Sequence, residues 1–400
     1  MFRTTKLGRA LALACCTAAV GGPASAETLS LPGGKAKVES LAKLDNPWAM
    51  AHLPDGRLLI TEKPGNLRTF ADDKLSEPIS GAPKVEYHDQ GGLLDVAVDP
   101  DFAKNQFVYL SFTERAEEQP PDAKEVKDER LGEYQDLNDA VLKGLAVARG
   151  RLNGDNLEDV TVIWRQTPKM IGRGHFGGRL VFAPDGKLFI TSGDRQRFEP
   201  AQDLGANLGK IVRINPDGSI PEDNPFAGKD GVLPEIWTIG HRNQLGAAIN
   251  PSSNELWTHE MGPKGGDEVN IIVKGKNYGW PIVSEGSHYN DVAIPKHKDK
   301  PEFTPPVIAW NPSISPSGLV FYQGDRFPGL KGKALLGGLS SEAVIVLTLD
   351  GNKVTGDEII KTGRRIRDIA EAPDGSLLLL GDEDGAELLR LVPKSKSDEG

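Results

Sequence analysis

Cysteine is almost absent from this 400-residue sequence, which contains only Cys15 and Cys16. Both lie in an N-terminal stretch with three basic residues, an Ala/Leu-rich run and small residues before position 27, a pattern typical of a signal peptide cleaved after Ala26. Residues 27–400 then have no cysteine and can form no disulfide, so a hydrophobic core, bound metal or both must stabilise them. We therefore predict a periplasmic or secreted protein with residues 1–26 as its signal peptide.

Long apolar runs and an excess of basic residues are also missing. The N-terminal apolar run is broken at Gly21-Gly22-Pro23 and is too short to span a bilayer, and no later segment is apolar enough to do so. The 47 Lys and Arg residues are outnumbered by 57 Asp and Glu residues, and the resulting net charge of −10 argues against nucleic-acid binding. We expect neither a membrane span nor a nucleic-acid partner.

Sustained helical periodicity is missing, whereas turn residues are abundant, with 46 Gly and 29 Pro. One phrase recurs, a Pro-Asp-Gly type turn followed by a short apolar strand. Clear copies start at Pro54, Pro184 and Pro373, and looser ones at Pro100, Pro251 and Pro316. The last of these sets the turn Pro316-Ser317-Gly318 before a strand at 319–321.

The spacing of these six copies indicates the fold. They lie 46 to 84 residues apart, at or above the roughly 40 to 50 residues that a four-stranded propeller blade occupies. We predict an all-β protein in which residues 27–400 form one domain, a six-bladed β-propeller of four-stranded blades. Two β-sandwich domains are the structural alternative.

The longest insertion between copies runs over about 114–150 and starts as an acidic, proline-bearing segment. Its second half, 134–148, could form an amphipathic helix with Leu137, Val141, Leu142 and Leu145 on one side. We interpret the insertion as a solvated surface excursion. The alternative is a lid or rim that shapes access to a site.

Polar stretches beside glycine interrupt the strand-and-turn pattern, where the loops of a propeller would meet around its axis. Gln90 precedes Gly91-Gly92, and its amide can both donate and accept hydrogen bonds. His175 stands among four glycines, on backbone that can reach unusual angles, and imidazole is the usual general base near neutral pH. The alternatives are a turn amide for Gln90 and a structural histidine for His175.

Three further stretches carry charge. Arg242 and Asn243 set a planar cation beside an amide, which suits a carboxylate or a polarised carbonyl, or else braces two blades. The segment 260–268 combines acidic side chains with Gly and Pro and offers the oxygen ligands of a hard cation such as Ca²⁺. Strand-like alternation places the guanidinium groups of Arg365 and Arg367 on one face, where they could clamp a polyanion or simply face solvent. An anionic, metal-chelating cofactor would unite these features.

Motifs of other enzyme classes are missing. The sequence has no GxGxxG turn into a helix, no P-loop, no HExxH and no Gly-x-Ser-x-Gly elbow. Nicotinamide, nucleotide, zinc-protease and α/β-hydrolase chemistry therefore lack support.

Six phrases occur in an order that is far more specific than any one of them. They are Gln90-Gly91-Gly92-Leu93-Leu94-Asp95, His175-Phe176-Gly177-Gly178-Arg179-Leu180, Gly240-His241-Arg242-Asn243, Gly262-Pro263 through Gly266-Asp267-Glu268, Asn277-Tyr278-Gly279-Trp280-Pro281 and Arg365-Ile366-Arg367-Asp368. In this order the chain resembles the soluble quinoprotein sugar dehydrogenases, the glucose/sorbosone dehydrogenase family, and most closely its aldose sugar dehydrogenase branch. The similarity runs from about Leu44 to Leu391 and omits only the insertion.

The resemblance implies a six-bladed propeller that oxidises the anomeric carbon of aldose sugars to lactones with pyrroloquinoline quinone (PQQ) and Ca²⁺. His175 would take the proton of the anomeric hydroxyl, and Arg242 would stabilise charge on the quinone. The implied cofactor-binding residues are Gln90, His175, Arg242, Asn243, Tyr289, Gly338, Leu339, Ser340, Arg365, Ile366 and Arg367. The implied calcium ligands are the carbonyls of Gly262 and Pro263 beside the quinone, and Glu268 with the Tyr278 carbonyl at a second, structural ion.

Two positions depart from the family pattern. Ser340 stands where relatives often have a lysine against the cofactor, and Leu245 stands where they usually have a glutamine. A serine can hydrogen-bond a carboxylate but brings no charge, so cofactor affinity should fall unless Arg365 and Arg367 suffice.

Partners and alternative functions follow from the same resemblance. We expect an aldose substrate, a soluble electron acceptor, and a monomer or homodimer. The alternatives are a Ca²⁺-dependent propeller lactonase and a non-catalytic propeller that binds a glycan or a protein.

Overall fold

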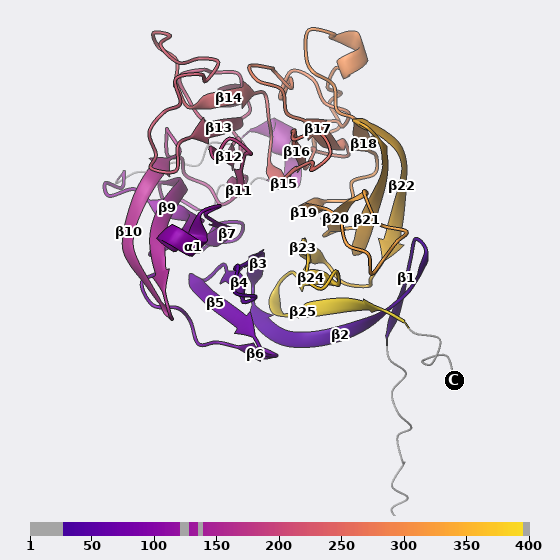
Figure 1. Cartoon of the computed structure of the whole chain (residues 1–400). Helices are drawn as coiled ribbons and strands as arrows, with labels where there is room; N and C mark the ends of the chain where they lie inside the picture. Colours follow the sequence, from indigo (N-terminus) through magenta and orange to yellow (C-terminus); the bar gives the residue numbers. More distant parts are fainter. Residues whose placement is uncertain (1–26, 121–127, 135–138, 395–400) are drawn as a thin grey trace, which may run out of the picture.

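The computed structural model describes residues 27–120, 128–134 and 139–394, so the predicted signal peptide lies outside the described residues. The described chain forms six antiparallel sheets around a central axis (Figure 1). The first three contain β3 (Pro47–His52), β4 (Leu58–Glu62), β5 (Asn66–Ala71) and β6 (Lys74–Leu75); β7 (Leu93–Val98), β8 (Phe107–Arg115), β9 (Lys143–Asn153) and β10 (Asn156–Arg165); and β11 (Gly177–Phe182), β12 (Leu188–Ser192), β13 (Lys210–Ile214) and β14 (Ile236–Ile239).

The remaining sheets complete the ring. They contain β15 (Gln244–Ile249), β16 (Leu256–Glu260), β17 (Asp267–Ile271) and β18 (Ile308–Trp310); β19 (Pro316–Phe321), β20 (Ala334–Gly338), β21 (Ala343–Asp350) and β22 (Lys353–Lys361); and β23 (Ile366–Glu371), β24 (Leu377–Gly381) and β25 (Asp384–Pro393) with β2 (Gly34–Asp45) and β1 (Thr28–Leu31). This architecture confirms the predicted all-β, six-bladed propeller and rules out two sandwiches.

Helices are few and short in the described part of the chain. They are α1 (Phe102–Asn105) and the 3₁₀ segments η1 (Glu129–Tyr134), η2 (Glu199–Ala201) and η3 (His297–Asp299). None of these is long and apolar enough to cross a membrane.

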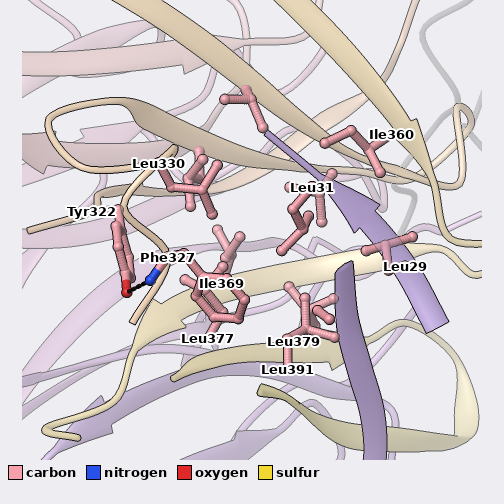
Figure 2. Close-up of a cluster of buried hydrophobic side chains, with 14 of the residues drawn as sticks. Leu29, Leu31, Tyr322, Phe327, Leu330, Ile360, Ile369, Leu377, Leu379 and Leu391 are labelled. Carbon is pink, nitrogen blue, oxygen red and sulfur yellow. Dashed lines mark hydrogen bonds between the residues drawn. The ribbon is translucent and has the colours of Figure 1, made fainter. Parts of the chain in front are cut away.

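The sixth blade joins the two ends of the described chain. β2 and β25 pair antiparallel with residues 36–45 opposite 384–393, and β1 extends the same sheet. Leu29 and Leu31 of β1 pack with Ile360 of β22 and Leu391 of β25 in a buried apolar cluster (Figure 2). The N-terminal strands thereby close the ring by hydrogen bonding and apolar burial, with no disulfide required.

The Pro-Asp-Gly turns build the hairpins between the first and second strands of blades. In the first blade, the Arg57 carbonyl accepts the Leu53 N–H at 2.8 Å, and the Asp55 carboxylate accepts the Arg57 N–H at 3.1 Å. Gly56 has a φ of 92°, which a residue without a side chain adopts without strain. The strand that follows, β4, is buried along its whole length, so these turns deliver apolar strands to the core.

The fifth copy of the phrase is misplaced by the sequence prediction. Pro316-Ser317-Gly318 lies inside β19, the first strand of its blade, where the pairing with β20 shifts register between Ser317 and Leu319. The turn that precedes the second strand is the segment 322–333, which contains glycine and proline but no Pro-Asp-Gly. The blade count stays correct because β19 is nevertheless a strand.

The predicted amphipathic helix at 134–148 is wrong over its described part. Residues 143–153 form β9, which pairs with both β8 and β10. Leu145 is fully buried there, as it is in a strand with neighbours on both sides. Leu137 and the rest of 135–138 lie outside the described residues. The excursion from the blade therefore covers about 116–142.

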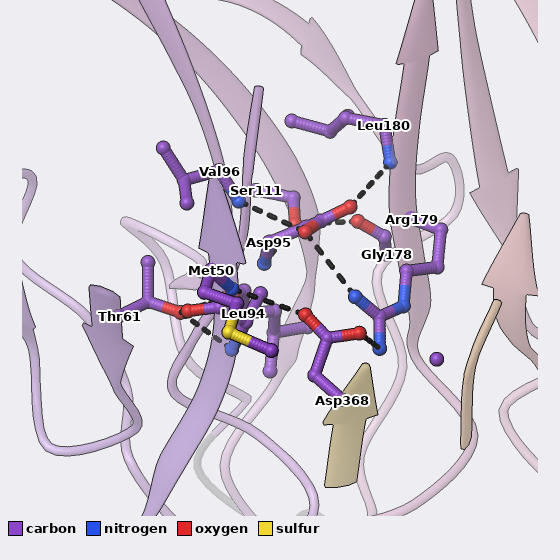
Figure 3. A network of polar contacts seen from close by, with 12 residues as sticks. Met50, Thr61, Leu94, Asp95, Val96, Ser111, Gly178, Arg179, Leu180 and Asp368 are labelled. Carbon is purple, nitrogen blue, oxygen red and sulfur yellow. Dashed lines mark hydrogen bonds and ion pairs between the residues drawn. The ribbon is translucent and has the colours of Figure 1, made fainter. Parts of the chain in front are cut away.

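A polar network at the axis ties three blades together (Figure 3). The buried Arg179 of β11 donates to Asp95 of β7 at 3.4 Å and lies 3.1 Å from Asp368 of β23. Burial raises the pKa of Asp95 to about 6, against the opposing effect of Arg179. The Arg179 guanidinium also lies 4.2 Å from the ring centre of Trp48. Trp48 also lines a cavity, so Arg179 packs against one of the residues that form the wall of that cavity.

Candidate functional site

The cavity beside this network has a volume of about 480 Å³ and is called the main cavity from here on, because predicted site residues line it. It is lined by Trp48, Lys63, Asp89, Gln90, Phe176, Gly177, Asn243, Leu245, Met261, Ser315, Leu339, Arg365, Arg367, Asp382 and Glu383. Five predicted cofactor-binding residues are therefore brought together: Gln90, Asn243, Leu339, Arg365 and Arg367.

The two arginines share one carboxylate. Arg365 donates through Nε and Nη2 to Oδ2 of Asp382 at 2.9 and 2.7 Å, and Arg367 donates to Oδ1 at the same two distances. Burial disfavours ionisation of Asp382, but the charges and hydrogen bonds of Arg367 and Arg365 outweigh it and lower its pKa to about 2. Asp382 therefore holds both guanidinium groups in fixed positions at the cavity wall.

The backbone around His175 is strained and tightly bonded. His175 has a φ of 52°, and its N–H donates to the Gln90 side-chain oxygen at 2.9 Å. The fully buried Arg195 donates to the carbonyls of Gly172 and Gly174 at 2.6 and 2.9 Å. The neighbouring glycines thus let the loop turn, while Gln90 and Arg195 fix where the imidazole points.

The His175 side chain is paired with a buried carboxylate. Its Nδ1 lies 2.7 Å from Oδ1 of Asp194, and Oδ2 of Asp194 accepts the indole N–H of Trp280 at 2.7 Å. Burial raises the pKa of Asp194, but attraction by His175 and Arg242 and the hydrogen bond with His175 outweigh it and bring the pKa below its usual value. Asp194 is therefore a carboxylate that can orient the imidazole and stabilise its protonated form.

Arg242 and the imidazole of His175 both line a second, smaller pocket. His175, Asp194, Arg242, Pro263 and Tyr289 all line this pocket. The Arg242 guanidinium donates to the carbonyls of Met261 and Gly262 at 2.9 and 2.8 Å and to the Tyr289 hydroxyl at 3.2 Å. The predicted base, the predicted arginine and Tyr289 thus face one space.

The insertion contributes a wall to this pocket. Leu131 of η1 is 1% exposed and packs with Phe198 and Trp280, and the Arg130 guanidinium lies 3.8 Å from the Phe198 ring centre. The Arg130 carbonyl accepts the Tyr289 N–H at 3.1 Å. Interpreting the insertion as a solvated excursion is therefore wrong for residues 130–131, which cover the His175 side of the site.

The predicted calcium ligands fall in two places. The Gly262 carbonyl and Pro263 lie beside Arg242. Glu268 of β17 is buried, and burial together with the negative charge of Glu260 raises its pKa well above the usual value. The Tyr278 carbonyl lies 3.0 Å from Nε2 of His297. In the described parts of the chain no three His, Cys, Asp or Glu side chains gather as a metal site, so backbone oxygens must complete either set.

The remaining predicted residues lie near the cavity but do not line it. The Ser340 hydroxyl donates to that of Ser315 at 2.7 Å, and Ser315 lines the cavity. Ile366 is fully buried in an apolar cluster, so its side chain points away from the site. Gly338 pairs with Pro316, and a Cβ there would lie 2.0 Å from the Ser341 hydroxyl.

The sequence prediction missed most of the site residues that lie just after the second strand of a blade. Lys63, Met261, Leu339 and Asp382 each directly follow such a strand and line the main cavity, and Asp194 follows one by two positions. Of these, only Leu339 is among the predicted site residues. Position relative to the repeated strand is the signal that identifies the others.

Comparison with known proteins places the chain in a family. Residues 44–390 match the family described as glucose/sorbosone dehydrogenase. The chain is 44% identical over 361 residues to aldose sugar dehydrogenase YliI of Escherichia coli, covering 88% of this chain and 91% of that protein.

Solved structures agree with this match. The soluble aldose sugar dehydrogenase of Escherichia coli in its apo form has a TM-score of 0.81 and 42% identity, covering 90% of this chain and 100% of that one. The PQQ-bound form of aldose sugar dehydrogenase from Streptomyces coelicolor has a TM-score of 0.66 and 25% identity, covering 91% and 100%. The chain therefore belongs to the glucose/sorbosone dehydrogenase family and is an oxidoreductase.

Proposed function

We propose that this protein oxidises the anomeric carbon of aldose sugars to lactones, with PQQ and Ca²⁺ bound at the site described above. The observation that carries the proposal is the pairing of His175 with the buried carboxylate of Asp194, next to a cavity walled by Arg365 and Arg367. The similarity to the aldose sugar dehydrogenase of Escherichia coli supports a sugar substrate, and the similarity to the PQQ-bound structure from Streptomyces coelicolor supports PQQ.

The lining of the main cavity fits an anionic, planar cofactor. Arg365 and Arg367 present guanidinium groups suited to carboxylates, and Gln90 and Asn243 offer amides suited to quinone oxygens. Leu339 adds an apolar surface, and Gly338, Ser340 and Ile366 are proposed to support the lining residues next to them in the sequence. When bound, PQQ supplies the quinone that accepts a hydride from the sugar.

The residues of the smaller pocket move the proton and hold charge. His175 accepts the proton of the anomeric hydroxyl at Nε2, because the hydrogen bond of Nδ1 to Asp194 favours the tautomer with a basic Nε2. Asp194 stabilises the resulting imidazolium. Arg242 lies beside the same space with Tyr289 and stabilises negative charge that develops there.

The oxygen donors also fit calcium. The Gly262 carbonyl accepts a hydrogen bond from Arg242 at 2.8 Å and has a second lone pair for a cation, and the Pro263 carbonyl is proposed as its partner ligand. Glu268 is a buried carboxylate beside Glu260, a pair whose mutual repulsion a divalent cation relieves, with the Tyr278 carbonyl as a further ligand. A Ca²⁺ ion held by the carbonyls of Gly262 and Pro263 would act as a Lewis acid at the site.

We also propose that the protein is exported from the cytoplasm. Residues 1–26 act as a signal peptide, the protein works in the periplasm or outside the cell, and a soluble carrier takes up the electrons. The protein acts as a monomer or homodimer.

The test is a cofactor titration of the purified chain. PQQ and Ca²⁺ are added while binding and dye reduction are followed with a panel of aldoses. Saturable binding with sugar-dependent dye reduction is the expected result. Failure of both binding and turnover would overturn the proposal, and release of acid from a lactone without PQQ would indicate a hydrolase instead.

A further inference from the structure

Three cations and three carboxylates line the main cavity, so their formal charges cancel. Asp382 bonds both arginines, and Glu383 lies 3.1 Å from Nε of Arg365. Two positive charges are therefore balanced locally by two carboxylates. The third acid of the lining, Asp89, is paired at 3.2 Å with Arg173, which is not part of the lining. The arginine pair alone thus gives the cavity no net positive charge.

Lys63 is the remaining cation of the lining, and its backbone is fixed. It directly follows β4, its N–H donates to the Asn46 carbonyl at 2.9 Å, and its carbonyl accepts the Leu93 N–H at 2.9 Å. Gly92 makes this contact possible, since a Cβ at position 92 would lie 2.2 Å from the Lys63 oxygen. The side chain therefore starts from a rigid position at the edge of the cavity.

The ammonium group of Lys63 is poorly satisfied by the protein itself. Its one hydrogen bond within the described chain goes to the backbone carbonyl of Asp89 at 3.2 Å, and it forms no salt bridge there. Burial, and then the charge of Arg367, lower the pKa of Lys63, with Asp382 and Asp89 opposing this. A half-buried ammonium with donors to spare is stabilised by an anion within hydrogen-bonding distance.

We infer that Lys63 supplies the one positive charge of the lining that no carboxylate of the described chain pairs with, and that it binds a carboxylate of the anionic cofactor. The inference rests on the proposed function and adds a residue to it. It also explains how the site tolerates Ser340, whose hydroxyl is bonded to Ser315 and brings no charge. A lysine that comes from the first blade replaces charge that the fifth blade lacks.

The experiment measures the affinity of the full chain for PQQ, with Ca²⁺ present, by equilibrium titration. Lys63→Met should weaken binding by about 10- to 100-fold, the usual worth of a hydrogen bond to a charged group. Lys63→Arg should restore most of the affinity. Lys74→Met, an exposed lysine of β6 in the same blade, is the matched control and should bind as the wild type does.

Two further measurements separate binding from folding. Thermal unfolding without PQQ should give similar midpoints for Lys63→Met and the wild type, and Lys63→Gln replaces the variant if Met fails to fold. Ser340→Lys, added to Lys63→Met, should recover affinity by returning a positive charge next to the cavity. If the wild type binds PQQ and Lys63→Met and Lys63→Gln bind equally well, the role of Lys63 is overturned alone. If the wild type does not bind PQQ, the proposed function is overturned as well.

Discussion

The Nδ1 atom of His175 lies 2.7 Å from Oδ1 of Asp194, while Oδ2 of the same carboxylate accepts the indole N–H of Trp280 at 2.7 Å. Both oxygens of Asp194 are thus engaged, and the carboxylate is completely buried. Such a carboxylate cannot turn away from the imidazole, so the orientation and tautomer of His175 are set before any substrate arrives.

Substitution of Asp194 by Asn should therefore lower kcat by about 100-fold or more, within the range that positioned general bases contribute. The amide can no longer stabilise the imidazolium, whereas its shape and burial are kept. PQQ affinity should stay within about threefold, because Asp194 does not line the main cavity. Steady-state kinetics and a PQQ titration give the two values.

The matched control is Asp230→Asn, an exposed aspartate outside the site, which should leave kcat unchanged. A pH profile of kcat distinguishes positioning from damage, since loss of Asp194 should move its acid limb and loss of folded protein should not. Equal losses of kcat and PQQ affinity in Asp194→Asn would contradict the assigned role.

The insertion should set the size of the substrate. Leu131 closes the pocket of His175 by packing on Phe198 and Trp280. Leu131→Ala should open this wall, so the ratio of kcat/KM for disaccharides to that for monosaccharides should rise several-fold. The measurement is dye-linked kinetics with both classes of sugar.

Leu330→Ala is the control for that variant. Leu330 is also fully buried, but in the cluster of Figure 2 between the fifth and sixth blades. A truncation of this kind costs about 2–5 kcal/mol of stability. An equal change of the substrate ratio in Leu330→Ala would mean that loosening the fold, rather than opening the wall, alters specificity.

The fold was predictable because its repeat is local. Each clear Pro-Asp-Gly copy encodes a hairpin through its own hydrogen bonds, as Asp55 and Gly56 do. Counting the three clear copies together with the three looser ones gives the six blades. The fifth copy failed because Gly318 with its φ of 67° serves a strand irregularity there and not a turn. The helix predicted at 134–148 failed because Val141 and Leu145 are four residues apart. Residues at this spacing lie on one face of a helix but also on one face of a strand, so the pattern does not distinguish the two.

From the residues alone, the candidate site was predictable only where glycine accompanies polar residues or where basic residues alternate along a strand, whereas Leu339 and Tyr289 were predicted from the family resemblance. His175 and Gln90 meet the first condition and the arginine pair meets the second, and all four lie around the described cavities. Asp382 and Lys63 also have a glycine nearby, at positions 381 and 65, but this pattern alone did not single them out, because their importance arises from neighbours elsewhere in the sequence. Asp382 matters through Arg365 and Arg367, and Lys63 through its place beside their shared carboxylate, and neither relation is visible until the blades are assembled.

Asp382 should make the free energy of unfolding depend on pH. Its pKa is about 2 in the folded protein and about 4 for an unperturbed aspartate. The folded state then binds fewer protons than the unfolded state, so this contribution, about 2 kcal/mol, is complete above pH 4 and is lost as the pH falls towards 2. Asp382→Asn should be less stable than the wild type at pH 6, and the difference should shrink as the pH is lowered. Urea unfolding at several pH values measures this, and a difference that is constant from pH 6 to pH 3 would contradict it.

Removal of the axial cation should be the most damaging of these changes. Arg179→Met leaves Asp95 and Asp368 buried without their guanidinium (Figure 3), and breaking a buried ion pair in this way costs about 3–5 kcal/mol. Burial already raises the pKa of Asp95 to about 6 with Arg179 present, and it raises that of Asp368 as well. Without the cation both carboxyls should protonate more readily, so the loss should be larger at pH 8, where ionisation is enforced, than at pH 5. Urea unfolding at the two pH values tests this sign.

Adding Asp95→Asn to Arg179→Met should recover part of the stability at pH 8, since it removes one of the two unpaired charges. A loss that is the same at both pH values, and no recovery in the double variant, would show that Arg179 stabilises the axis by packing on Trp48 and not by its charge.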